Sequence, residues 1–127
     1  MIKGIEGIML SSAHPRKLAK FYQSIGITIG QEWEMGDNAE PFFEMKLKSG
    51  SGFYVAPHSK VKGQAKDPHR IILNFEVDEI KAMVKKLKGL KVKVIADTYH
   101  IEGYGWVATF ADIDGNIFQL AQIRAKK

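Results

Sequence analysis

The sequence lacks cysteine entirely, which excludes disulfide bonds, thiolate metal ligands and a cysteine nucleophile and favours a reducing compartment. Long apolar runs are lacking too, because no stretch approaches the roughly 20 apolar residues of a membrane-spanning helix. The apolar start, residues 1–10, contains Lys3 and Glu6, and no small-residue cleavage site follows it, so we expect no secretory signal. We therefore expect a cytoplasmic protein with no membrane partner.

A strongly basic region is also missing, although the 127 residues carry a formal net charge of +5. Residues 1–63 hold 8 Lys and Arg against 6 Asp and Glu, and residues 64–127 hold 11 against 8. A nucleic-acid-binding domain usually concentrates its basic residues on one face, so this even spread predicts no nucleic-acid partner. Hydrophobic residues make up 45% and charged residues 26%, which is typical of a folded domain and excludes general disorder.

One pattern occurs twice along the chain. Apolar residues at the helical spacing i, i+3, i+4, i+7 appear in two sets, 62 residues apart, and each set predicts an amphipathic helix. The sets are Leu18, Phe21, Tyr22, Ile25 and Ile80, Met83, Val84, Leu87. Pro15 suits the first turn of the first helix, and Asp78 is the predicted N-cap of the second. Gly26 and Gly89 follow the two stripes and are the predicted C-terminal caps.

Strand patterns surround both predicted helices. Residues that alternate with period 2 predict one strand before each helix and three strands after it. The predicted strands are 7–11, 27–35, 42–48 and 52–57 in the first half, and 71–77, 91–99, 104–111 and 116–122 in the second. Clusters of Gly, Ser and Asp at 49–52 and 112–116 predict tight turns between the last two strands of each half.

These elements predict an α+β protein made of two β-α-β-β-β modules, at about 1–57 and 69–123, joined by a polar linker at 58–68. A module of about 60 residues is marginally stable by itself. The two modules are therefore expected to pair into a single domain, either within one chain or by exchange between two chains.

Strand alternation also sorts the side chains onto two faces of the predicted sheets. The face that the helices need to cover takes the apolar set Ile8, Leu10, Phe53, Val55, Leu73, Phe75, Phe118 and Leu120. The opposite face mixes polar and apolar residues, including Ser11, Glu44, Tyr54, Asn74, Glu76, Thr109 and Gln119. Apolar surface with a few convergent polar groups is typical of a small-molecule site; a half-solvated sheet face is the alternative.

The paired modules, with Phe21-Tyr22 and Ile25-Gly26 closing the first helix, resemble the vicinal oxygen chelate superfamily of glyoxalase I, bleomycin-resistance proteins and extradiol dioxygenases. The segment 106–120, with its Asp112-Ile113-Asp114-Gly115-Asn116 turn, resembles the last two strands of that family. The resemblance implies the glyoxalase/bleomycin-resistance-like fold, in which paired modules form an open curved mixed sheet around a concave site. It also implies a homodimer.

In metal-dependent members of the superfamily, four His, Gln or Glu side chains on the concave faces bind a divalent ion. Carried onto this sequence, those four positions fall on Gly7, Tyr54, Ile72 and Gln119. Glycine and isoleucine have no ligating side chain, so the usual metal site is expected to be absent and no cofactor is predicted. A divalent ion would require a rearranged ligand set, for example from His58, His69, His100 and Glu102, which otherwise are solvated loop residues.

Three aromatic residues, His100, Tyr104 and Trp106, are predicted to lie in a loop punctuated by Gly103 and Gly105. They would either stack on a planar ligand, with the loop closing as a lid, or plug the end of the core. Trp33, between two glutamates, is predicted either at the rim of the site or half-buried in a strand.

We therefore expect a protein that binds a small organic molecule in a concave pocket without the usual metal site. The expected ligand-binding residues are Ser11, Glu44, Tyr54, Asn74, Gln119, His100, Tyr104 and Trp106. The basic balance favours an anionic ligand. The alternative is a lyase or isomerase resembling lactoylglutathione lyase, with a rearranged metal site or with Glu76 as its base. A module whose concave face binds another protein is a third possibility.

Overall fold

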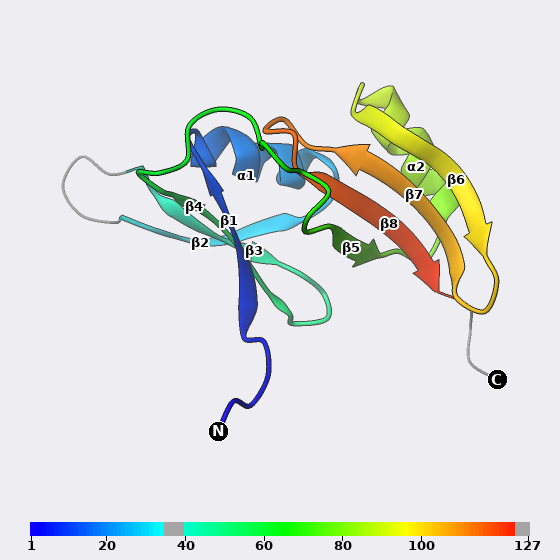
Figure 1. The fold of residues 1–127 in the computed structure, drawn as a ribbon, viewed down its shortest axis with the longest axis horizontal. Helices are drawn as coiled ribbons and strands as arrows, with labels where there is room; N and C mark the ends of the chain where they lie inside the picture. The colour runs from blue at the N-terminus through cyan, green and yellow to red at the C-terminus, as the bar shows by residue number, and fades with distance from the viewer. Residues whose placement is uncertain (35–39, 124–127) are drawn as a thin grey trace. The chain divides into compact units, whose positions relative to one another are not determined.

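The computed structural model describes residues 1–34 and 40–123, which contain two modules of the same β-α-β-β-β order (Figure 1). The first contains β1 (Gly7–Ser12), α1 (Pro15–Ser24), β2 (Thr28–Trp33), β3 (Phe42–Lys46) and β4 (Gly52–Pro57). The second contains β5 (Leu73–Glu76), α2 (Ile80–Gly89), β6 (Lys93–Ile101), β7 (Gly105–Ala111) and β8 (Ile117–Ile123). They belong to two compact units, Met1–Gly63 (unit 1) and Gln64–Lys127 (unit 2).

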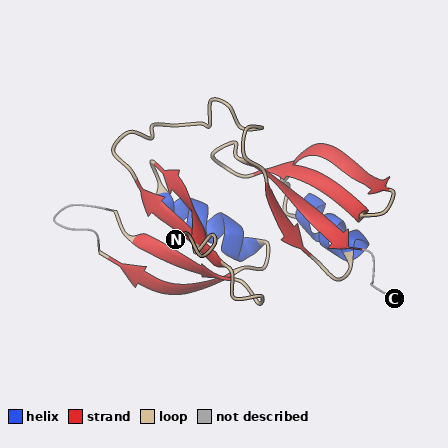
Figure 2. Ribbon diagram, turned by 60° about the horizontal axis from the view of Figure 1, so that its bottom comes forward, coloured by secondary structure: helices blue, strands red, loops and turns tan. Residues whose placement is uncertain are grey.

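Unit 1 is a four-stranded mixed sheet in the order β1-β4-β3-β2, with β1 parallel to β4 and the other pairs antiparallel. Helix α1 lies along one face of this sheet (Figure 2). Its buried stripe includes Leu18 and Tyr22, and the Tyr22 ring meets Phe53 edge-on at 5.3 Å between centroids. The helix therefore covers the face that alternation assigned to the apolar side chains of β4.

Unit 2 repeats this topology, with the order β5-β8-β7-β6 and a parallel pair of β5 and β8. Helix α2 buries Ile80, Val84 and Leu87, and the helix-facing residues Phe118 and Leu120 of β8 are almost fully buried. Two helices and two mixed sheets confirm the predicted α+β class and the repeated β-α-β-β-β module. Neither ten-residue helix could cross a membrane, and the described residues contain no longer one.

The predicted turn at 112–116 forms as its composition requires. The Asp112 carboxylate is buried and accepts hydrogen bonds from the backbone N–H of Asp114 (2.9 Å) and of Asn116 (3.0 Å) and from the Asn116 amide (2.9 Å). Gly115 has φ of 83°, a conformation that glycine adopts without steric cost. The turn therefore joins β7 to β8 in a register that pairs Thr109 with Gln119.

The predicted caps of α1 are confirmed, and those of α2 are wrong. Pro15 lies in the first turn of α1, and Gly26 follows that helix at φ of 121°. The N-cap of α2 is Glu79 and not Asp78, and no side chain of its own turn caps it. Gln122 of β8 instead accepts a hydrogen bond from the Ile80 N–H at 2.8 Å. This arrangement leaves the first turn of α2 dependent on a neighbouring strand.

The C-terminal cap of α2 also differs from the prediction. Gly89 is still helical, and the chain turns two residues later at Lys91, which has φ of 64°. Ile8 was expected in the core but is 39% exposed, because it lies on the edge strand β1, which has a neighbour on one side only.

The strand boundaries shift by up to two residues. The predicted strand 27–35 is observed as Thr28–Trp33, and its last predicted residue lies outside the described part of the chain. The predicted strand 91–99 is observed as Lys93–Ile101. The boundary between the units falls inside the predicted linker, where the Ala65 N–H bonds to the Asp114 carbonyl at 2.7 Å.

Candidate functional site

The helix-free face of unit 1 is centred on Tyr54. Its hydroxyl donates a hydrogen bond to Glu6 Oε1 at 2.6 Å, so the ring extends from β4 across β1. A Cβ added at Gly7 would stand 2.7 Å from Tyr54 Cε2. Tyr54 therefore occupies the space above Gly7, and only glycine leaves room for it there.

The acidic surroundings raise the pKa of the Tyr54 hydroxyl. Its hydrogen bond to Glu6 contributes most, followed by desolvation and by the negative charges of Glu6 and Glu44. The hydroxyl therefore stays protonated at neutral pH and donates to Glu6.

Glu44 lies beside Tyr54 in the register of β3 and β4. Its carboxylate accepts a hydrogen bond from the Gln31 N–H at 3.1 Å and lies directly over Gly30, where a Cβ would collide with it. The predicted site residues Glu44 and Tyr54 are thus neighbours. Ser11 lies on the same face of β1, half-buried and two residues beyond Met9, which pairs with Tyr54.

The helix-free face of unit 2 carries a polar row across three strands. The Gln119 amide donates to Thr109 Oγ1 at 3.0 Å, and Asn74 pairs with Gln119 on the other side. Glu76 lies two residues further along β5, next to Ala121 of β8. The row has apolar neighbours, since Val107 and Ala121 are almost fully buried. The structure therefore brings Asn74, Gln119 and Glu76 onto one face, as predicted.

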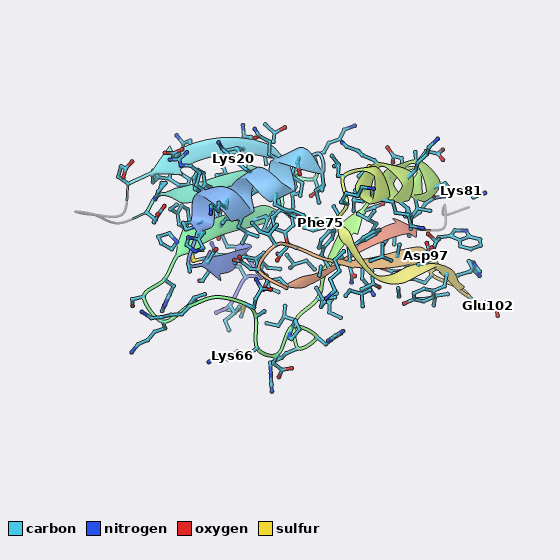
Figure 3. All side chains as sticks on the ribbon, turned by 90° about the horizontal axis from the view of Figure 1, so that it is seen from above. Lys20, Lys66, Phe75, Lys81, Asp97 and Glu102 are labelled. Carbon is cyan, nitrogen blue, oxygen red and sulfur yellow. The ribbon has the colours of Figure 1, made fainter. Side chains whose placement is uncertain are left out.

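The predicted aromatic loop is wrong. His100 belongs to β6 and Trp106 to β7, where they pair with their ring centroids 4.7 Å apart. Only Glu102, Gly103 and Tyr104 form the turn between these strands, and Glu102 lies at its tip (Figure 3). The pairing of His100 with Trp106 extends β6 two residues beyond the predicted end of this strand.

Trp106 also lies on the other face of the sheet from the polar row. It pairs with Gln122, the residue that caps α2. Trp106 is 45% exposed and Tyr104 is 38% exposed, so neither plugs the core. His100 and Trp106, with Glu76 and Asp78, line an open hollow of about 480 Å³ beside the start of α2.

A second hollow, of about 710 Å³, lies in unit 1 and contains none of the expected ligand-binding residues. Its lining includes Ser12, Glu40, His58, Ser59 and Lys62. Ser12 is almost fully buried, but its Oγ already accepts a hydrogen bond from the His14 N–H at 2.9 Å.

The described residues contain no cluster of three or more His, Asp or Glu side chains arranged to hold a metal ion. His58 Nδ1 accepts a hydrogen bond from the Lys60 N–H at 3.0 Å, and His100 packs on Trp106. His58 lies in unit 1, whereas His69, His100 and Glu102 lie in unit 2.

Two residues of the unit 1 face were not predicted as site residues. Glu6 accepts a hydrogen bond from the Tyr54 hydroxyl, and Phe42 stacks on the Tyr54 ring at 5.4 Å between centroids. Phe42 could be placed on this face from the alternation of β3. No local signal in the sequence predicts the reach of Tyr54 to Glu6, which is 48 residues away.

The sequence matches no known protein-family profile and no curated protein. Solved structures of similar fold are numerous. They include a glyoxylase/bleomycin resistance protein/dioxygenase domain from Frankia (18% identity, TM-score 0.78, covering 98% of this chain and 100% of that one). A glyoxalase family protein from Bacillus cereus is 12% identical, with a TM-score of 0.77 and coverage of 98% and 97%.

The fosfomycin resistance protein FosX from Listeria monocytogenes is 18% identical, with a TM-score of 0.75 and coverage of 98% of this chain and 96% of that one. These similarities extend over nearly the whole of each chain and include both modules. They confirm, at the level of the fold, the resemblance to the vicinal oxygen chelate superfamily. The chain has the fold of the glyoxalase/bleomycin resistance/dioxygenase proteins.

Proposed function

We propose that the protein binds a small organic molecule on the helix-free faces of its sheets and does so without the metal ion of the metal-dependent proteins of this fold. The position of Tyr54 over Gly7 carries the metal part of the proposal. The resemblance assigns ligands to positions 7 and 54. At the first there is no side chain, and at the second the hydroxyl is already bonded to Glu6 at 2.6 Å.

The remaining two positions support the same conclusion. Ile72 has no ligating atom, and the amide of Gln119 is engaged with Thr109 at 3.0 Å. A divalent ion needs several oxygen or nitrogen ligands that converge on one point. A Tyr hydroxyl whose pKa is raised is poorly suited to bind one, because a metal prefers the phenolate.

The polar groups on both faces support ligand binding. Each face offers a few hydrogen-bonding side chains among apolar or aromatic neighbours, which is the usual composition of a small-molecule site. In unit 2 the Gln119 amide N–H donates to Thr109 at 3.0 Å, and the carbonyl oxygen of the same side chain is a further hydrogen-bond acceptor. Asn74 is exposed beside it.

The enzyme alternative uses either a rearranged metal site or Glu76 as its base, and the position of Glu76 bears on the second form. This residue is exposed on its strand, so its own sheet does not supply the dry surroundings that turn a carboxylate into a base at neutral pH. We therefore favour binding over a lyase or isomerase reaction. The homodimer implied by the resemblance stays a prediction, which sedimentation equilibrium can test.

Metal content and ligand binding test the proposal separately. Elemental analysis of protein dialysed against Zn, Ni, Mn and Fe should find less than stoichiometric metal, and the melting temperature should not rise with any ion. A stoichiometric ion that stabilises the protein would contradict the metal part of the proposal.

For binding, a library of small organic molecules would be screened by thermal shift. Any ligand found should bind several-fold more weakly to Gln119→Leu or Tyr54→Leu protein. The Gln23→Leu variant makes the same chemical change on the exposed surface of α1 and should bind normally. If no substitution on the helix-free faces affects any ligand, the proposed site is wrong.

A further inference from the structure

Three aromatic rings form a continuous row across the sheet of unit 1. Trp33 of β2 lies 5.1 Å from Phe42 of β3, and Phe42 is stacked 5.4 Å from Tyr54 of β4, with 29° between the two ring planes. The Tyr54 ring then continues over Gly7 of β1. The row therefore crosses all four strands of the sheet.

This aromatic row lies on the face that α1 does not cover. The helix packs on Phe53, and its Arg16 lies over the Phe43 ring at 5.2 Å. Phe42 and Tyr54 are the sequence neighbours of those two residues, so strand alternation turns them to the opposite side. Trp33 pairs with Phe42 and is 37% exposed, and Phe42 and Tyr54 are half-buried.

Carboxylates lie at the Tyr54 end of the aromatic row, although the protein as a whole is basic. The sequence from 32 to 44 contains four Glu and one Asp and no Lys or Arg. Glu44 and Glu6 lie at the Tyr54 end, close enough for both charges to act on its hydroxyl. Glu34 and Glu40, next in the sequence to Trp33 and Pro41, are exposed, and their charges act on Arg16 of α1.

Two cations lie near this region and offset part of the negative charge. Arg16 forms a two-bond ion pair with Glu32, at 2.9 and 3.2 Å, on the side of the helix. Lys46 is exposed on β3, two residues beyond Glu44 and on the same face. On this face Glu6 and Glu44 are therefore offset by one lysine, Lys46.

We propose that the ligand of the unit 1 face is a flat aromatic cation, which stacks on Trp33, Phe42 and Tyr54 and whose charge is balanced by Glu6 and Glu44. This inference rests on the proposed function and specifies the class of its ligand. It replaces the anionic ligand that the net charge favoured, because a pocket responds to its nearby charges and not to the total.

Two physical effects favour this ligand class. Aromatic faces attract a cation through their quadrupole, and the attraction grows when water is excluded. Carboxylates within a Debye length of about 8–10 Å add a Coulombic attraction that salt weakens. Single-stranded nucleic acids also stack on aromatic rows, but they require a groove of basic residues along their phosphates, whereas Glu6 and Glu44 lie beside Tyr54 here.

The test uses two probes of the same shape and opposite charge, 10-methylacridinium and acridine-9-carboxylate. Each is titrated with the full chain, and binding is followed by the probe's fluorescence and by the NMR signal of the Trp33 indole N–H. We expect the cation to bind at least about tenfold more tightly than the anion, to shift the Trp33 signal and to weaken as salt is added.

Variants separate stacking from charge. Trp33→Leu should weaken 10-methylacridinium binding about five- to tenfold. The double variant Glu6→Gln and Glu44→Gln keeps the hydrogen-bond acceptors, removes two charges and should weaken binding about three- to tenfold. Glu102→Gln, at the tip of the β6–β7 turn (Figure 3), removes one charge far along the chain from the row and should change nothing.

Several results would overturn the inference. Equal binding of the two probes, or tighter binding of the anion, would exclude a cationic ligand; so would binding of the cation that Trp33→Leu leaves unchanged. Failure of both probes would also overturn it. None of these results contradicts the proposed function, whose own test is a screened ligand that depends on Gln119 or Tyr54.

Discussion

Replacing Gly7 by alanine directly tests the packing of Tyr54 over β1. The new Cβ would stand 2.7 Å from Tyr54 Cε2 and 3.2 Å from the backbone C and Cα of Gly52. Carbon atoms in ordinary contact are about 3.5–4.0 Å apart. The ring must therefore move by about 1 Å, which strains its bond to Glu6, or β1 must separate from β4.

Overpacking of this kind costs typically about 1–3 kcal/mol. For a chain of this length, a loss of about 2 kcal/mol lowers the melting temperature by roughly 6–10 °C. Urea unfolding followed by circular dichroism would measure the loss as a lower midpoint at an unchanged slope. Because φ at Gly7 is not in the left-handed region, the loss would report packing and not backbone strain.

A matched control and a double variant make the test specific. Gly89→Ala introduces the same methyl group at the end of α2, where no atom lies within 4 Å, and should stabilise the helix by up to about 1 kcal/mol. Removing the ring with Tyr54→Leu should lessen the cost of Gly7→Ala by about 1 kcal/mol. If Gly7→Ala is as stable as the wild type, Tyr54 does not lie over β1 as described.

Three further predictions concern other parts of the chain. Gln122→Leu removes the cap of α2 at the Ile80 N–H and should lower the free energy of unfolding by about 0.5–2 kcal/mol, measured by thermal unfolding. Adding Glu79→Ser, which supplies a local cap, should restore much of this stability. No restoration would contradict the capping role. The Lys88 ammonium, 2.7 Å from Asp97, lowers the pKa of that carboxyl. The Asp97–Lys88 pair therefore stabilises the fold fully above the ordinary pKa near 3.8, and this stabilisation is lost as the pH falls below it. Asp97→Asn should flatten the acid side of the plot of stability against pH, and an unchanged plot would refute this prediction. The pKa of Tyr54 is raised, so one tyrosine of the protein should ionise above the usual pH of about 10 in an absorbance titration. Tyr54→Phe should remove that late transition. If the variant instead loses a transition at the ordinary pH, the assignment is wrong.

The module structure was predictable because it depends on local periodicity. The apolar stripes ending at Ile25 and Leu87 predict the two helices, and the alternation of β4 and β8 places Phe53 and Phe118 under them. The turn at 112–116 was also predictable, because Asp112 bonds to backbone groups within four residues. All of these features depend on interactions between near neighbours in the chain.

The site was predictable only in part. Alternation correctly placed Glu44 and Tyr54 on one face, and Asn74 and Gln119 on one face. The side chains of a strand alternate between its two faces whichever strand pairs with it. It failed at His100, because the end of β6 depends on pairing with β7 and not on composition.

The sequence by itself determined two amphipathic helices, eight strands in two repeats, and which side chains of each strand share a face. Only the tertiary structure decided that Tyr54 reaches Glu6, that Gln122 caps α2, and that Trp33, Phe42 and Tyr54 form one row. The physical reason is that a period of two defines the face of a residue but not the partner strand or the register. The contacts between residues 42 and 48 positions apart form only when the partner strand and the register of each sheet are established.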